Sequence, residues 1–367
     1  MASGFPSVGW TSLLPQTNAA VDMIGRIVFF LALSLIVKRG DCRLGWGLIL
    51  VALIVLILGD QQRLQPWAYQ SALYALAIAS FDWPVARRWI IAVAISIYAY
   101  SAAGKLDYQF VHTVGAEMVR AAASPLVEIS LVQASKISLA LPLSELLIAC
   151  ILIYPKTRWL GGWFAIALHL TLLLLLGPWG MNHSLGVLVW NGLLACQAYL
   201  LFLSGSAPPM RVQRRTPWMY VSTVLLLAAL LLPCLERRGY WDHWPSWALY
   251  SPHNSRVELE VHETALEYLP SSLKPHVEDH DADRWHTVDI EQWSLSQRLV
   301  PIYPQARYQL AIAHRLALRV KSDDAIRAKL LGVADRFDGT RQQRYLLGRR
   351  QIRAAANESW IGPKEEQ

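Results

Sequence analysis

The sequence predicts an all-α membrane protein, a polytopic bundle of about eight transmembrane helices followed by a small mixed α+β soluble C-terminal domain. Two observations lead to this fold class. Hydrophobic residues make up 54% of the chain and charged residues only 17%, and the apolar residues occur in blocks rather than at amphipathic spacing. After Leu235 the chain becomes polar to its end, which leaves enough residues for one small domain.

We divide the chain into an N-terminal interfacial segment (1–20), the bundle (21–235) and the extramembrane domain (236–367). Residues 1–20 lack the basic start and long apolar core of a signal peptide, so Phe5, Trp10 and Leu13–Leu14 are expected to rest at the membrane interface. The predicted spans are about as long as the ~20 residues that cross a bilayer, or slightly shorter. They cover residues 21–37, 44–59, 67–81, 89–104, 137–154, 159–177, 184–204 and 218–235.

The distribution of Lys and Arg predicts the orientation. With the N-terminus outside, the inner loops carry ten of these residues and the outer loops four, which favours both termini on the non-cytoplasmic side. The short loops suit a bacterial inner membrane. The net charge of +7 comes mostly from loop arginines and the basic last hundred residues, so we expect the lipid bilayer and not nucleic acid as the partner.

In the polar region, residues 256–263 alternate apolar and polar side chains and predict a strand, with a second strand at 285–293. Three helical stretches are expected after Gln305, the middle one capped at residues 322–324. His276, His280 and His286 lie among acidic residues but lack the fixed spacing of metal ligands, so we predict no metal site.

The stretch YAYSAAGKLDYQFVHTVGAEMV, residues 98–119, carries the most chemistry. Lys105 follows directly on an apolar span, with Asp107 two residues later. One interpretation is a lysine that extends its ammonium to the membrane surface. The other is a general base or anion-holding cation, because a lysine shielded from water loses proton affinity.

Further polar side chains are predicted near the same face. We expect Asp60, Arg63, Asn182 and His183 to position a substrate there. Deeper in the bundle, the short turn PKTR places Glu145 and His169 at nearly the same depth, facing each other. They are either an inter-helix hydrogen bond that fixes the hairpin or a proton relay, because buried ionisable groups are costly unless paired.

Two stretches carry a resemblance to known proteins: YSAAGKLDYQFVHTVGAEM, and LSELLIACILIYPKTRWLGGWFAIALHLTLLLLLGPWG. Residues 21–204 resemble the membrane region shared by vitamin K-dependent gamma-carboxylase-like (HTTM) proteins and DoxX/MauE-like proteins. In the carboxylase, a lysine in this context is thought to deprotonate a quinol on the lumenal side, and the resemblance places that role on Lys105. His169 matches the histidine of the following hairpin. The C-terminal part here is much smaller than the carboxylase's lumenal portion.

These observations favour a multi-pass membrane protein with an outward-facing intramembrane site that acts on a quinone- or lipid-like small molecule. Lys105 is the expected base, with Glu145 and His169 as proton relay. The alternative is a non-catalytic scaffold whose outer C-terminal domain binds a protein partner. The sequence assigns no cofactor.

Overall fold

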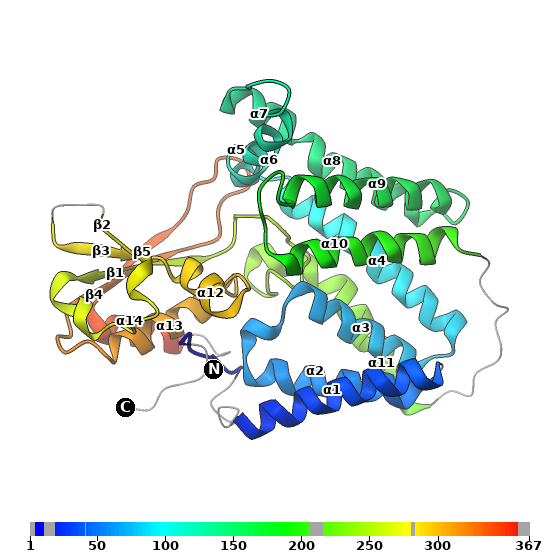
Figure 1. Ribbon diagram of the computed structural model, residues 1–367, viewed down its shortest axis with the longest axis horizontal. Coiled ribbons are helices and arrows are strands. Elements are labelled where there is room, and N and C mark those ends of the chain that lie inside the picture. The colour runs from blue at the N-terminus through cyan, green and yellow to red at the C-terminus, as the bar shows by residue number, and fades with distance from the viewer. Residues whose placement is uncertain (1–3, 11–18, 41, 206–215, 280–282, 359–367) are drawn as a thin grey trace.

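The computed structural model describes residues 4–10, 19–40, 42–205, 216–279 and 283–358. It has two parts, a bundle of long helices and a sheet-containing C-terminal domain at one end of that bundle (Figure 1). The N-terminal residues 4–10 lie beside the C-terminal domain.

A helix occupies most of each of the eight predicted spans, because each span is mostly apolar and is bounded by polar or helix-breaking residues. Proline at the first or second position starts three of them, where its missing N–H costs nothing. The helices are α1 (Ala19–Arg39), α2 (Arg43–Gly59), α3 (Pro66–Ser80), α4 (Trp83–Lys105), α8 (Ala140–Ile153), α9 (Arg158–Leu176), α10 (Leu185–Ala198) and α11 (Pro217–Leu231).

Five stretches of the described chain are long and apolar enough to cross a membrane, as expected of an integral membrane protein. They are Ala19–Arg39, Leu131–Ile153, Arg158–Leu176, Leu185–Leu203 and Pro217–Arg238. A sixth arises if α4 and the helical segment Tyr108–Ala123, which meet at an angle of 72°, form one broken span. The 17-residue α2 is shorter, and α3, with 15 residues, includes the polar Gln70 and Ser71.

Three short helices connect α4 to α8 and form a cap on the bundle (Figure 1). They are α5 (Tyr108–His112), α6 (Val114–Ala123) and α7 (Leu131–Ser138). In α6 one side is buried, at Gly115, Ala116 and Met118, which matches the amphipathic pattern of its sequence. A reciprocal pair of hydrogen bonds between Ser130 and Gln133 starts α7.

The C-terminal domain contains a five-stranded antiparallel sheet with the strand order β2-β3-β1-β4-β5. The strands are β1 (Arg256–His262), β2 (Val277–Asp279), β3 (Trp285–Val288), β4 (Ile326–Leu331) and β5 (Gln343–Leu347). Helices α12 (Ile290–Arg298), α13 (Ala306–Ala317) and α14 (Gly348–Glu358) complete the domain. The predicted first strand is therefore confirmed as β1.

The predicted middle helix after residues 322–324 is wrong, because β4 occupies that position. Its Ile326 and Ala328 point into the core, and the strand pairs with β1 over six residue pairs. Such pairing with a distant strand outweighs the weak local helical pattern. The predicted second strand is shorter than expected, since α12 begins at Ile290.

The N-terminal segment packs into the C-terminal domain rather than resting at a membrane interface. Phe5 is 2% exposed, with its ring centroid 4.6 Å from that of Trp293, and Val8 is fully buried. The guanidinium of Arg315 donates a hydrogen bond to the Ser7 carbonyl. The expected Leu13–Leu14 contact lies outside the described residues.

The C-terminal domain contacts the bundle where α2, α4 and α11 end. Asp60, after α2, pairs with Arg298 at the end of α12. A 3₁₀ helix η3 (Leu232–Arg238) continues α11, and its Arg237 donates a hydrogen bond to the Ala334 carbonyl. The Tyr108 amide, just beyond α4, donates to the Arg336 carbonyl. Polar groups of the bundle and of the C-terminal domain therefore meet at this end of the bundle.

Candidate functional site

Helix α4 carries three polar side chains along one stripe that faces the other helices. Tyr98, Ser101 and Lys105 are three, four and seven residues apart, so helical geometry places them on one side. All three are buried by neighbouring parts of the protein. Small residues beside them, Ala102 and Gly104, let other segments approach closely.

Lys105 forms an ion pair inside the protein. Its Nζ atom lies 2.5 Å from Oε1 of Glu145 on α8 and 2.8 Å from Oγ of Ser101. The side chains of Lys105 and Glu145 are 7% and 9% exposed. The lysine therefore points into the bundle instead of extending toward the surface. Oε2 of Glu145 is buried and has no hydrogen-bond partner among the described residues.

His169 on α9 is held by two other helices. Its Nδ1 atom lies 3.0 Å from Oδ1 of Asn191 on α10, and its Nε2 lies 2.9 Å from the hydroxyl of Tyr98. The Asn191 amide donates to the Val187 carbonyl, so its Oδ1 faces the histidine as an acceptor. His169 Nδ1 therefore carries the proton, and in the neutral ring Nε2 accepts from Tyr98.

The sequence predicts that Glu145 and His169 face each other. The structure instead joins each of them to α4, Glu145 through Lys105 and His169 through Tyr98. No hydrogen bond links Glu145 to His169 within the part of the chain that the structure describes. Helix α4 packs against α8 and supplies the polar partners that the hairpin alone lacks.

Asp60 and Arg63 have partners other than the Lys105 cluster. The fully buried Asp60 carboxylate accepts from Arg298 at 2.9 Å, from the Gln62 amide at 3.2 Å and from the Val8 amide at 3.4 Å. It therefore joins α2, the N-terminal segment and the C-terminal domain. Arg63 pairs with Asp22 at the start of α1. Both residues act in this structure as ties between elements.

Asn182 and His183 lie in the loop between α9 and α10. Asn182 adopts a left-handed conformation with φ of 51°, which asparagine tolerates better than most residues. The ring of His183 meets that of Tyr250 edge to face at 5.5 Å. Burial lowers the pKa of the His183 imidazole below its ordinary value.

Comparison with protein-family models, with curated proteins and with solved structures finds no match for this chain. A buried amine beside a carboxylate with one free oxygen can hold or move a proton. A neutral imidazole bonded to a phenol is a second group able to exchange protons nearby.

Asp107, which sequence reasoning placed beside Lys105, pairs with a different cation. Its buried Oδ2 lies 2.5 Å from Arg237 of η3, while Oδ1 accepts from the Gln109 and Phe110 amides at the start of α5. The Asp107 carboxylate therefore caps a helix and ties it to η3.

One cluster was missed by the sequence analysis. Glu236, His243 and His253 are all buried, and one possible ligand atom from each lies within 4.8 Å of the others. Their spacings of seven and ten residues match no familiar motif, so only the presence of two histidines in an aromatic-rich stretch hinted at them. In the acidic run singled out earlier, His276 bonds Ser296, His286 lies in β3, and His280 lies outside the described residues.

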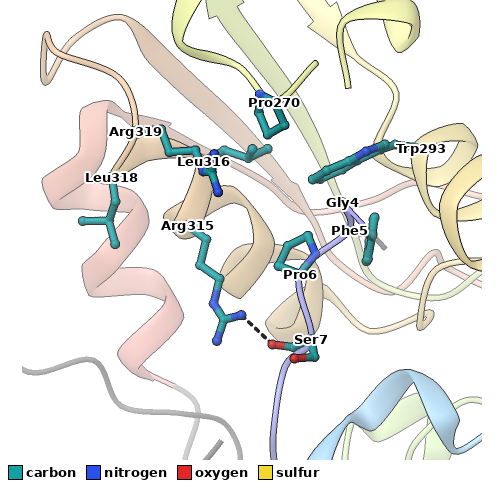
Figure 2. A pocket seen from close by; sticks show the side chains of 10 residues that line it. All are labelled: Gly4, Phe5, Pro6, Ser7, Pro270, Trp293, Arg315, Leu316, Leu318 and Arg319. Atoms are coloured by element: carbon teal, nitrogen blue, oxygen red, sulfur yellow. Dashed lines mark hydrogen bonds between the residues drawn. The ribbon is translucent and has the colours of Figure 1, made fainter. Parts of the chain in front are cut away.

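A cavity of about 510 Å³ lies between the N-terminal segment and the C-terminal domain (Figure 2). The rings of Phe5 and Trp293 line one part of it, and Arg315 lines another. The residues that line this cavity do not include Lys105, Glu145 or His169. It is therefore separate from the buried polar cluster of the bundle.

Proposed function

We propose that this chain is an integral membrane protein whose Lys105–Glu145 pair acts on a quinone- or lipid-like small molecule, with Lys105 as the base. The observation that carries the proposal is the 2.5 Å ion pair between two side chains that the protein buries. Burying two charges is costly, and hydrophobic residues of similar volume often give equal or better stability. A role in proton transfer therefore explains a polar pair at this position better than a contribution to folding stability does.

Lys105 becomes a base only after its ammonium has given up a proton. Oε1 of Glu145 is the nearest acceptor, and transfer to it leaves a neutral amine beside a neutral carboxylic acid. The amine then takes a proton from an acidic hydroxyl of the bound molecule, such as a quinol, and the new ammonium stabilises the resulting oxyanion. Oε2 of Glu145 offers a further hydrogen-bonding position.

His169 and Tyr98 supply a second proton-exchanging pair on the same side of α4. In the proposal they orient the small molecule or return the proton. Asn191 fixes the tautomer of His169, because the Asn191 amide donates to the Val187 carbonyl and leaves its Oδ1 to accept from His169. The resemblance of residues 21–204 to vitamin K-dependent carboxylase-like and DoxX/MauE-like proteins supports Lys105 as the base, on the non-cytoplasmic side of a bacterial inner membrane.

A ligand-dependent thermal-shift experiment tests this proposal. The detergent-purified protein is heated with a series of quinones, quinols and phospholipids, and wild type is compared with Lys105→Met, with Lys105→Met/Glu145→Gln and with Lys38→Met. Lys38 is an exposed lysine at the end of α1 and serves as the matched control. A ligand at a hundred times its Kd stabilises the folded protein by ~2.7 kcal/mol.

We expect a quinol or quinone to raise the melting temperature of wild type and Lys38→Met but not of the two Lys105 variants. The double variant keeps the experiment decisive if the single one folds poorly, because it leaves no unpaired buried charge. A stabilisation of the same size in the folded double variant would rule out Lys105 as part of the binding site. Absence of any stabilising ligand for wild type would favour a scaffold function.

A further inference from the structure

The missed cluster of Glu236, His243 and His253 lies where the bundle joins the C-terminal domain. Glu236 belongs to η3, and the two histidines come from the segment between η3 and β1. The exposed fractions of Glu236, His243 and His253 are 8%, 3% and 0%. Two imidazole rings and one carboxylate thus meet in the interior, a different set of groups from the Lys105–Glu145 pair.

Two imidazole nitrogens are directed at the same carboxylate. His243 Nδ1 lies 2.8 Å from Glu236 Oε1, and His253 Nε2 lies 3.0 Å from Oε2 and 3.1 Å from Oε1. The rings themselves are 5.0 Å apart between centroids, at an interplanar angle of 68°. The two ring nitrogens therefore converge on the Glu236 carboxylate, and the two rings do not stack.

The two separations between a ring nitrogen and the carboxylate are close to those that a bound metal requires, and all three donor atoms lie within 4.8 Å of one another. Metal–ligand distances of about 2.0 to 2.2 Å put neighbouring donor atoms about 3.3 Å apart in a tetrahedral site and about 3.0 Å apart in an octahedral one. Small side-chain movements would open room for an ion between the three donors. Two histidines and one glutamate form a donor set typical of catalytic zinc and of other divalent transition metals.

The charge of the cluster favours a cation. Within the described part of the chain, only the two histidines lie within ion-pair distance of the Glu236 carboxylate. Its sequence neighbour Arg237 is directed to Asp107 and to the Ala334 carbonyl instead. Arg336 interacts with this carboxylate from beyond ion-pair distance, and while the histidines are neutral the buried charge lacks an ion-pair partner, which is expensive. A dication would compensate the carboxylate and replace the two imidazole protons that now face it.

The surrounding backbone holds the ligands in place. The His253 carbonyl accepts from the Ala334 amide at 2.9 Å, and Arg341 donates to the Pro252 and Asn254 carbonyls on either side. The Glu236 carbonyl accepts from the Gly239 amide at 2.8 Å. Ligands fixed by their own backbone contacts lose little freedom when a metal binds.

We propose that Glu236, His243 and His253 form a binding site for a divalent transition metal ion of the Zn²⁺ class. The ion would link η3 at the end of the bundle to the segment that leads into β1. The site is independent of the proposed function of Lys105. A three-ligand set leaves one coordination position for water or a small anion.

The test measures metal binding by the full-length protein in detergent. Zn²⁺ and Co²⁺ are titrated after treatment with a chelator, bound metal is counted, and the visible spectrum of the Co²⁺ form is recorded. We compare wild type with Glu236→Gln, with His253→Gln and with His112→Gln, which removes an exposed histidine as the control. We expect about one ion per chain in wild type and His112→Gln, with at least a tenfold weaker affinity in the two cluster variants.

The wild-type protein alone decides the result if the cluster variants do not fold. A Co²⁺ spectrum with the intense bands of a low-coordinate site, and a melting temperature that rises with Zn²⁺ and falls with chelator, supports the proposal. Wild type that takes up no stoichiometric Zn²⁺ or Co²⁺ overturns it, and so does uptake of unchanged affinity by folded Glu236→Gln. The cluster would then be a hydrogen-bonded link only.

Discussion

The Lys105–Glu145 pair makes a quantitative prediction about stability. With 2.5 Å between Nζ and Oε1 and an effective dielectric constant of about 20, the Coulomb attraction is about 7 kcal/mol. The desolvation of both groups opposes this attraction, so the pair contributes much less in net terms. If one partner is removed, the other charge is still buried and still pays its desolvation cost, but the attraction that offset this cost is lost.

We therefore expect Lys105→Met and Glu145→Gln each to lower the free energy of unfolding by about 3 to 5 kcal/mol. The double variant Lys105→Met/Glu145→Gln should lie within about 1.5 kcal/mol of wild type, because neither charge is left unpaired. Ser101 then loses only the hydrogen bond from Nζ, worth about 1 kcal/mol.

Denaturant unfolding in detergent micelles, followed by tryptophan fluorescence, provides the assay. The double-mutant cycle should give a coupling energy of at least about 4.5 kcal/mol between the two positions. Strictly additive effects of the two single variants would refute the reasoning, because they would mean that the side chains do not interact in the folded protein.

Two more predictions concern Asp60 and His183, whose partners are other residues than this pair. Asp60→Asn should weaken the contact with Arg298 by about 1.5 to 3 kcal/mol and make the C-terminal domain more sensitive to limited proteolysis, whereas Asp338→Asn on the surface should not. Burial lowers the folded-state pKa of His183, so the unfolded chain binds the proton first and stability is lost as the pH falls below about 6.5. Between pH 8 and pH 5.5 the melting temperature of His183→Phe should fall less than that of wild type. Equal decreases would contradict this assignment.

The sequence was most informative where burial in an apolar block made polar residues conspicuous. Lys105, Glu145 and His169 stood out because charged or titratable groups in such blocks are expensive, and the structure buries all three. Their exact partners were not predictable, since they depend on how α4 packs against the hairpin of α8 and α9.

Long-range pairing explains the errors. Asp60 and Arg298 are separated by 238 positions, and no local pattern links them. Strand β4 is a strand because β1 lies beside it, and Phe5 is buried because the C-terminal domain encloses it. The Glu236, His243 and His253 cluster depends in the same way on the fold of the segment before β1.

The burial of Phe5 has a consequence for the order of assembly. Arg298 donates to the Phe5 carbonyl across 293 positions, so residues 4–10 find this partner only after the chain through α12 has been made. Such distant contacts slow folding, because the intervening chain must be closed into a loop first. The C-terminal domain can complete its core only when the bundle has brought the N-terminal segment to it. Insertion of the helices and closure of the domain are thus coupled steps, and the contacts of residues 4–10 with α12 and α13 form late.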